Sequence, residues 1–268
     1  MAVVPPPAPE VRARRRDDPS LITVAGVELA RLRRGFPLWF TLGLPIALVL
    51  PLGLISVGSP EGQAGQLWGV WSGVVAMFWG VSLPMVGALY TSAAARQDEG
   101  ARAVLYGYAV PRYRFLLGRF AALALLGSCQ AGLLVALLAP MGAVLEEPQA
   151  AGAAAASVLL PWAASLGPLV LCLLVAEEWG FAPTVCLGVL GSLFGALLAD
   201  KSVWWAVPLG WPMTAVVPLA DVRASGVPLP EGHPLTDAGI VPLVVALSAG
   251  LAAVLLAAGA YRVGRKEL

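Results

Sequence analysis

The sequence predicts an all-α polytopic membrane protein, and three observations lead to that prediction. Hydrophobic residues make up 59% of the 268 residues and charged residues only 12%, whereas soluble domains are about a quarter charged. The mean hydropathy is +0.81. The apolar residues are also gathered in runs of the length that a helix needs to cross a bilayer, about 20 residues. A soluble fold would expose large apolar patches, so a bilayer is the expected solvent.

Six apolar runs are expected to form transmembrane helices. They cover residues 37–57, 68–92, 115–140, 157–176, 181–198 and 240–261. At most Arg119, near one end of the third run, places a formal charge in any of them. A charge at mid-bilayer costs about 2.5–3.5 kcal/mol on insertion scales, so these runs insert readily. Only Glu177-Glu178-Trp179-Gly180 separates the fourth and fifth runs, which predicts a tight helical hairpin with a water-facing turn.

The distribution of Lys and Arg predicts the orientation in the membrane. Fifteen of the seventeen Lys and Arg residues flank the first span, the loop between the second and third spans, or the C-terminus. Only Lys201 and Arg223 belong to the segments on the other side. By the positive-inside rule, both termini and that loop are cytoplasmic. A composition rich in Ala, Gly and Arg suggests a GC-rich bacterial genome, and hence a bacterial plasma membrane.

The N-terminal segment divides into a tail and a surface helix. Residues 1–17 are expected to form a disordered cytoplasmic tail, followed by one membrane domain over residues 18–268. Asp18 suits the N-cap position and Pro19 the first helical position. Apolar residues recur at helical spacing from residue 19 to 34, which predicts an amphipathic helix on the cytoplasmic surface. Glu28 lies at the edge of its apolar stripe.

The expected external segment before the last span, residues 199–239, is unusually long for a connection. Val203-Trp204-Trp205-Ala206-Val207 is apolar enough to lie in the interface or to enter the membrane as a short re-entrant helix. Tryptophan favours the level of the lipid headgroups, which supports both alternatives.

The sequence carries no set of residues that predicts catalysis. It has no GxxxxGK[ST] motif for ATP and a single histidine, His233, which is expected to be solvated. Its three cysteines, Cys129, Cys172 and Cys186, lie in apolar runs and are expected to be buried hydrophobic residues rather than metal ligands. The net charge of +1 gives no field for nucleic acid. No acidic or basic residue lies mid-span, which argues against ion-driven transport but leaves open a carrier whose ion binds backbone carbonyls. Energy for any transport is therefore expected from a partner.

The cytoplasmic loop at residues 95–114 combines a charged half, an apolar half and then Pro111-Arg112. This pattern predicts a short helix along the inner surface that ends at Pro111. The loop is either an ordinary positive-inside connection or a docking surface for a cytoplasmic partner, and its spacing favours neither.

Three features together resemble the ABC-2 type transporter permeases, in particular the lantibiotic or bacteriocin export and immunity permeases. The first is the surface helix with Glu28 and the basic residues 31–34. The second is the order Glu99-Gly100, Val110-Pro111-Arg112 and Gly118-Arg119. The third is the six-span layout with a long loop before the last span. The chain departs from the family in that arginine directly follows the proline, and Arg119 stands where the family has lysine.

The resemblance implies a membrane-spanning permease subunit of an ATP-driven exporter, without ATPase motifs of its own. Two permeases, identical or sister chains, would each bind a cytoplasmic ATPase that holds ATP and magnesium. The region around residues 98–105 would be a coupling helix. The residues expected to dock the ATPase are Asp98, Glu99, Arg102, Val104, Leu105 and Glu28. The cargo would be a lantibiotic-like peptide or another amphipathic antimicrobial, moved for secretion or for self-protection.

Two patterns within the spans allow a functional and a packing interpretation. Trp71, Trp79 and Tyr90 share one helical face and either line a path for an amphipathic peptide or pack against neighbouring helices. Gly191 and Gly195 form a GxxxG motif that serves either a subunit interface or packing within the chain. A different class of function also stays open, that of a non-transporting scaffold or sensor subunit that holds cytoplasmic partners at the membrane.

Overall fold

The computed structural model describes residues 19–58, 63–98, 112–145, 148–230 and 232–265. In these ranges the chain is helical, with no strand beyond one isolated bridge between Val222 and Pro228. Six segments are long and apolar enough to cross a membrane, as the sequence predicts. Five of them are the helices α3 (Phe36–Gly58), α4 (Ala64–Asp98), α6 (Arg112–Leu145), α9 (Phe181–Leu198) and α11 (Ile240–Arg265).

The remaining span consists of two consecutive helices, α7 (Pro148–Ala164) and α8 (Leu166–Trp179). The sequence did not predict the interruption at Ser165. Its cause is Pro168, which has no amide hydrogen to donate to the carbonyl of Ala164 one turn earlier. The Gly167 amide instead donates to the Ser248 hydroxyl of α11 at 2.8 Å, so the break is held by a neighbouring span.

The spans differ in how deeply they lie in the bundle. The α7–α8 window is 61% buried and the α4 window 56%, whereas those of α3, α9 and α11 are each 22% buried. The central helices therefore carry the core, which includes Trp79 and Tyr90 of α4 and Leu123 and Leu134 of α6. The outer helices keep apolar side chains on the surface, where only lipid or another protein could cover them.

The predicted hairpin between the fourth and fifth spans is confirmed. The two helices α8 and α9 are joined by the single residue Gly180, whose φ is +78°. Glycine adopts this left-handed conformation without the clash that a Cβ atom would cause.

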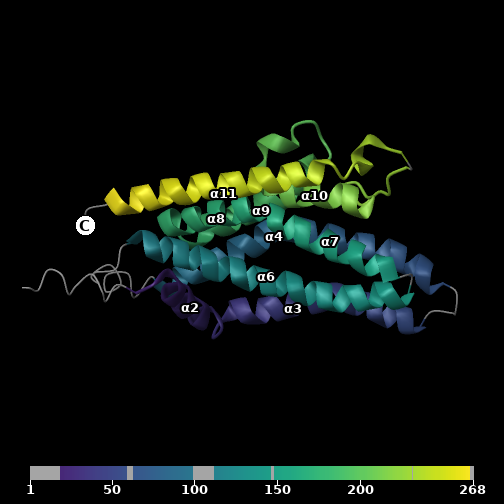
Figure 1. Ribbon diagram of the computed structural model, residues 1–268, viewed down its shortest axis with the longest axis horizontal. Helices are drawn as coiled ribbons and strands as arrows, with labels where there is room; N and C mark the ends of the chain where they lie inside the picture. The colour runs from purple at the N-terminus through teal and green to yellow at the C-terminus, as the bar shows by residue number, and fades with distance from the viewer. Residues whose placement is uncertain (1–18, 59–62, 99–111, 146–147, 231, 266–268) are drawn as a thin grey trace, which may run out of the picture.

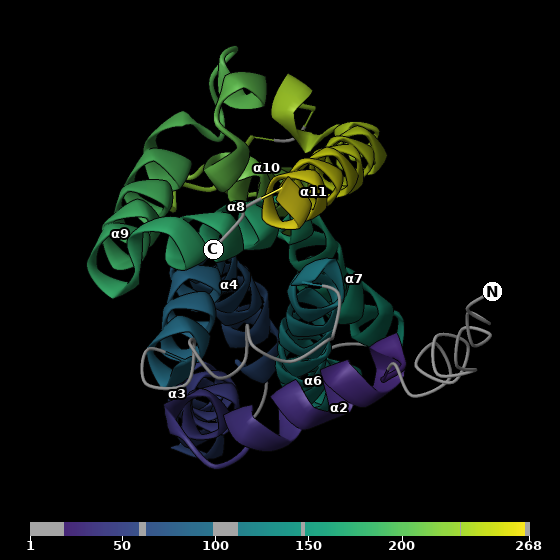
Figure 2. The same ribbon diagram turned by 90° about the vertical axis from the view of Figure 1, so that its left-hand side faces the viewer.

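The predicted surface helix is present as α2 (Leu21–Leu32), shorter than the expected 19–34. The predicted cap is wrong, because Ser20 is the N-cap and its hydroxyl accepts the Thr23 amide at 3.1 Å. Pro19 then precedes the cap rather than opening the helix. Figure 2 shows α2 lying across one end of the bundle, at a large angle to the spans.

The long segment between α9 and α11 contains a buried short helix at a place the sequence did not predict. Trp204–Ala206 forms only one 3₁₀ turn, and Trp205 in it is exposed. The helix that enters the bundle is α10 (Trp211–Ala220), in which every residue from Trp211 to Pro218 is buried. It packs against α4, α7 and α11 and lies beside them in Figure 1.

Candidate functional site

One end of the bundle gathers most of the charged residues that the structure describes, and we refer to it as the α2 end. It contains α2, the end of α4, the start of α6, the α8–α9 junction and the end of α11 (Figures 1 and 2). Positive-inside bias makes this the expected cytoplasmic end.

Close packing of α2 onto α6 depends on Gly118. A Cβ atom on Gly118 would lie 2.6 Å from Cγ1 of Val24, which is closer than atoms can approach. The glycine therefore lets α2 settle directly on α6, with Val24, Glu28 and Leu32 buried beneath it. Glu28 lies one turn after Val24 on α2, and this contact brings it to Arg119, the residue that follows Gly118 on α6.

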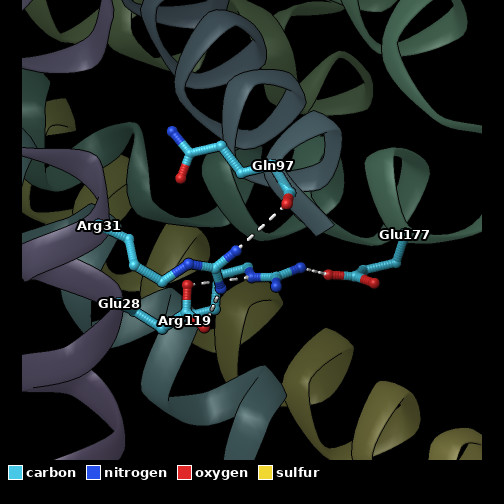
Figure 3. A network of polar contacts seen from close by, with 5 residues as sticks. All are labelled: Glu28, Arg31, Gln97, Arg119 and Glu177. Atoms are coloured by element: carbon cyan, nitrogen blue, oxygen red, sulfur yellow. Dashed lines mark hydrogen bonds and ion pairs between the residues drawn. The ribbon is translucent and has the colours of Figure 1, made fainter. Parts of the chain in front are cut away.

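Arg119 is the centre of a buried network of charged side chains (Figure 3). Its Nη1 atom donates to Oε1 of Glu177, near the end of α8. Its Nε atom lies 3.8 Å from Oε2 of Glu28 in α2. The side chains of Arg119 and Glu28 are each 7% exposed and that of Glu177 is 22% exposed. One guanidinium thus ties the surface helix and two spans together.

Arg31 extends the network to a third span. Its Nη1 atom lies 3.2 Å from Oε1 of Glu28, and its Nη2 atom donates to the Gln97 carbonyl oxygen at 3.4 Å. Gln97 is the last residue but one of α4. The network therefore reaches the point where α4 meets the loop that the sequence singles out.

The formal charges of the network cancel, because Glu28 and Glu177 face Arg31 and Arg119. Buried charges of this kind persist only when they are paired, since removing one partner leaves a charge with little water to stabilise it. Such a network couples the positions of the elements that supply it. We therefore take the α2 end as the candidate functional site.

The structure buries Glu28 in the bundle, and its part in ATPase docking stays a prediction. The resemblance implies an ATPase-docking residue, but the residue is 5% exposed and its carboxylate faces Arg31 and Arg119. Glu28 fixes α2 to the bundle instead of presenting its charge outward. Of the other expected docking residues, Asp98 is the last residue of α4. Glu99, Arg102, Val104 and Leu105 lie outside the described residues, and their role stays a prediction.

Two of the three expected substrate-path residues lie inside the core. Trp79 and Tyr90 are fully buried. Trp79 Nε1 donates to the Val158 carbonyl oxygen at 3.0 Å, and the Tyr90 hydroxyl donates to Gln130 Oε1 at 2.9 Å. Trp71 is partly buried beside the same core. In this conformation the residues pack between helices, and a role in a substrate path stays a prediction.

Gly191 and Gly195 pack within the chain. A Cβ atom on Gly191 would lie 3.0 Å from Leu209 and from Pro84, and one on Gly195 would lie 3.3 Å from the Cα atom of Gly210. Both glycines are buried under this chain's own segments. This packing accounts for the GxxxG spacing without a second subunit.

The pairing of Arg119 with Glu177 was missed from the sequence. Glu177 was expected in a water-facing turn, which is wrong because its carboxylate points at Arg119. One signal was available. Arg119 is the only formal charge inside a predicted span, and a charge at that depth needs a partner. The hairpin glutamates are expected at the same end of the bundle.

The structure describes no metal centre: in its described ranges, no group of three or more His, Cys, Asp and Glu side chains could hold an ion. The three cysteines are free, Cys172 buried and the other two exposed.

The fold defines the chain as a multi-pass α-helical membrane protein. Comparisons with protein-family models, curated proteins and solved structures find no match for this chain.

Proposed function

We propose that this chain is the permease subunit of an ATP-driven ABC exporter in a bacterial plasma membrane. It would pair with a second permease and bind a cytoplasmic ABC ATPase through residues 98–105. Its cargo would be a lantibiotic-like peptide or another amphipathic antimicrobial. The observation that carries the proposal is the network at the α2 end, which joins a surface helix to the bases of three spans.

The network suits a subunit that is driven from the cytoplasm. A partner that displaces α2 or the end of α4 acts on Glu28, Arg31 and Gln97, and through Arg119 on the α8–α9 hairpin. Such a movement is a rigid-body displacement of packed helices. Displacements of this kind allow ligand binding to a partner to change how the spans are arranged. The partner must bind the two arrangements with different free energies for this to occur.

The charge distribution supports an external energy source. In the described spans the formal charges lie near the ends, so no carboxylate or basic side chain is placed at the midplane to couple transport to protons. The order of Glu99, Pro111 and Arg119 in the sequence supports the ABC-2 assignment in particular.

Co-purification from native membranes tests the proposal. The tagged full-length chain is solubilised in mild detergent, and retained proteins are identified by mass spectrometry. We expect an ABC ATPase with a Walker motif to be retained by the wild type and lost in the charge reversals Glu99→Lys and Arg102→Glu. The matched control is Arg223→Glu, a charge reversal at the opposite end of the bundle.

Two results would contradict the proposal. One is that no ABC ATPase accompanies the wild-type chain. The other is that both reversals retain the ATPase as fully as Arg223→Glu does, with unchanged ATP hydrolysis. Retention of other cytoplasmic proteins without an ATPase would favour a scaffold instead.

A further inference from the structure

A groove of about 400 Å³ opens at the end of the bundle opposite α2. Its walls are the starts of α4 and α7, and α10 ends in it. Small residues such as Gly73 and Ala153 leave the space open, and Trp68 forms an apolar wall. No part of the network described above reaches this groove.

The polar groups that line the groove are mostly hydrogen-bond acceptors. The Ser72 hydroxyl donates to the Gly69 carbonyl at 3.3 Å, and the Ser157 hydroxyl donates to the Ala154 carbonyl at 2.9 Å. With its proton directed to that carbonyl, each hydroxyl presents its oxygen to a ligand as an acceptor. Gln149, through its amide NH2 group, and Trp68, through its indole N–H, are the wall side chains that offer a donor to a ligand.

The end of α10 adds negative potential. The last four carbonyl groups of a helix have no partner within it, and together they act as about half a negative charge. A Cβ atom on Gly73 would lie 3.6 Å from the Ala220 carbonyl oxygen, so α10 ends against a residue without a side chain. Asp221 caps this end in the left-handed conformation and carries a full negative charge on the groove lining.

No Lys, Arg or His is among the described residues that line the groove. An exposed carboxylate, a helix C-terminus and two hydroxyl oxygens therefore border a cavity with an apolar wall. We infer that this groove binds an organic cation, a primary ammonium or guanidinium group carried on an apolar body. The inference rests on the proposed function only in naming the ligand as cargo, such as a basic side chain of an amphipathic peptide.

Cysteine labelling of the purified full-length chain, in nanodiscs of uncharged lipid and without any ATPase, tests the groove directly. The background carries Cys129→Ala and Cys186→Ala, which removes the exposed native thiols. Ala153→Cys places a thiol in the groove. Gly152→Cys is the matched control, because Gly152 is exposed with nothing within 4 Å. Each variant reacts with methanethiosulfonates that carry either an ammonium or a sulfonate group.

We expect the ratio of ammonium to sulfonate labelling rates to be about two- to fivefold higher for A153C than for G152C. This factor corresponds to the effect of one helix terminus on the free energy of a nearby unit charge. Adding Asp221→Asn should lower the A153C ratio, and asparagine preserves the left-handed cap. Phenethylammonium should slow labelling of A153C, and 2-phenylethanol should not. Equal ratios for the two variants, or equal protection by the alcohol, would overturn the inference. Neither result depends on an ATPase, so the proposed function is tested separately.

Discussion

Replacing Arg119 by methionine tests whether the buried network holds the α2 end together. The substitution removes the guanidinium but keeps an unbranched side chain of similar length. Arg31 remains 3.2 Å from Glu28 and still neutralises it, so the charge left uncompensated is that of Glu177. Breaking a buried pair from one side costs about 3–5 kcal/mol. Because Glu177 is 22% exposed and thus partly hydrated, we expect a loss at the lower end, about 3 kcal/mol.

The free energy of unfolding is measured by reversible titration with SDS in mixed micelles. The double variant Arg119→Met/Glu177→Gln removes both charges, so it should return to within about 1 kcal/mol of the wild type. The control Arg34→Met removes an exposed arginine at the same end of the bundle, and it should cost no more than about 1 kcal/mol. If Arg119→Met costs no more than this control, or if the double variant is no more stable than the single one, the network does not stabilise the fold as described.

Three further predictions concern the packing and the orientation of the spans. Gly127→Ala should destabilise the chain by about 1–3 kcal/mol, because its Cβ would overlap the indole of Trp162. The control Gly132→Ala, on the same helix, meets nothing within 4 Å and should be neutral or slightly stabilising. Equal effects of the two substitutions in SDS titration would refute this packing. Tyr90→Phe should cost about 1–3 kcal/mol in the same assay, because it leaves a buried glutamine oxygen without its donor, and a cost below about 0.5 kcal/mol would contradict this. In whole cells a membrane-impermeant maleimide should label Ser202→Cys directly and Glu178→Cys only after permeabilisation, and the reverse pattern would invert the orientation.

The spans were predictable because each follows from a local property, the length of an apolar run. The hairpin at Gly180 was also predictable from a local property, the length of the gap between two apolar runs. Four residues are too few to connect the two spans in any other way. The fourth span begins earlier than expected, at Pro148 rather than residue 157. Its first turns are mostly alanine, which has the best helix propensity but contributes little hydropathy. A prediction based on hydropathy therefore places the start of the span too late.

The parts that were missed depend on contacts between distant residues. Arg119 and Glu177 are 58 positions apart, and only the packing of α6 beside α8 brings them together. The helix α10 has ten residues, too few for a span, and it is buried only because α4, α7 and α11 surround it. At the start of α2, two residues suited to capping flank Pro19. Only the geometry of the first turn selects Ser20 over Asp18.

The position of the charges has an electrical consequence. In the described spans no formal charge lies in the middle, and the deepest one, Arg119, is seven residues from Arg112, where α6 begins. The membrane potential performs work of about 2.3 kcal/mol for each elementary charge that crosses 100 mV. The four network charges sum to zero, so a shared shift of Glu28, Arg31, Arg119 and Glu177 carries almost no net charge through that field. A rearrangement of this network should therefore depend little on the membrane potential.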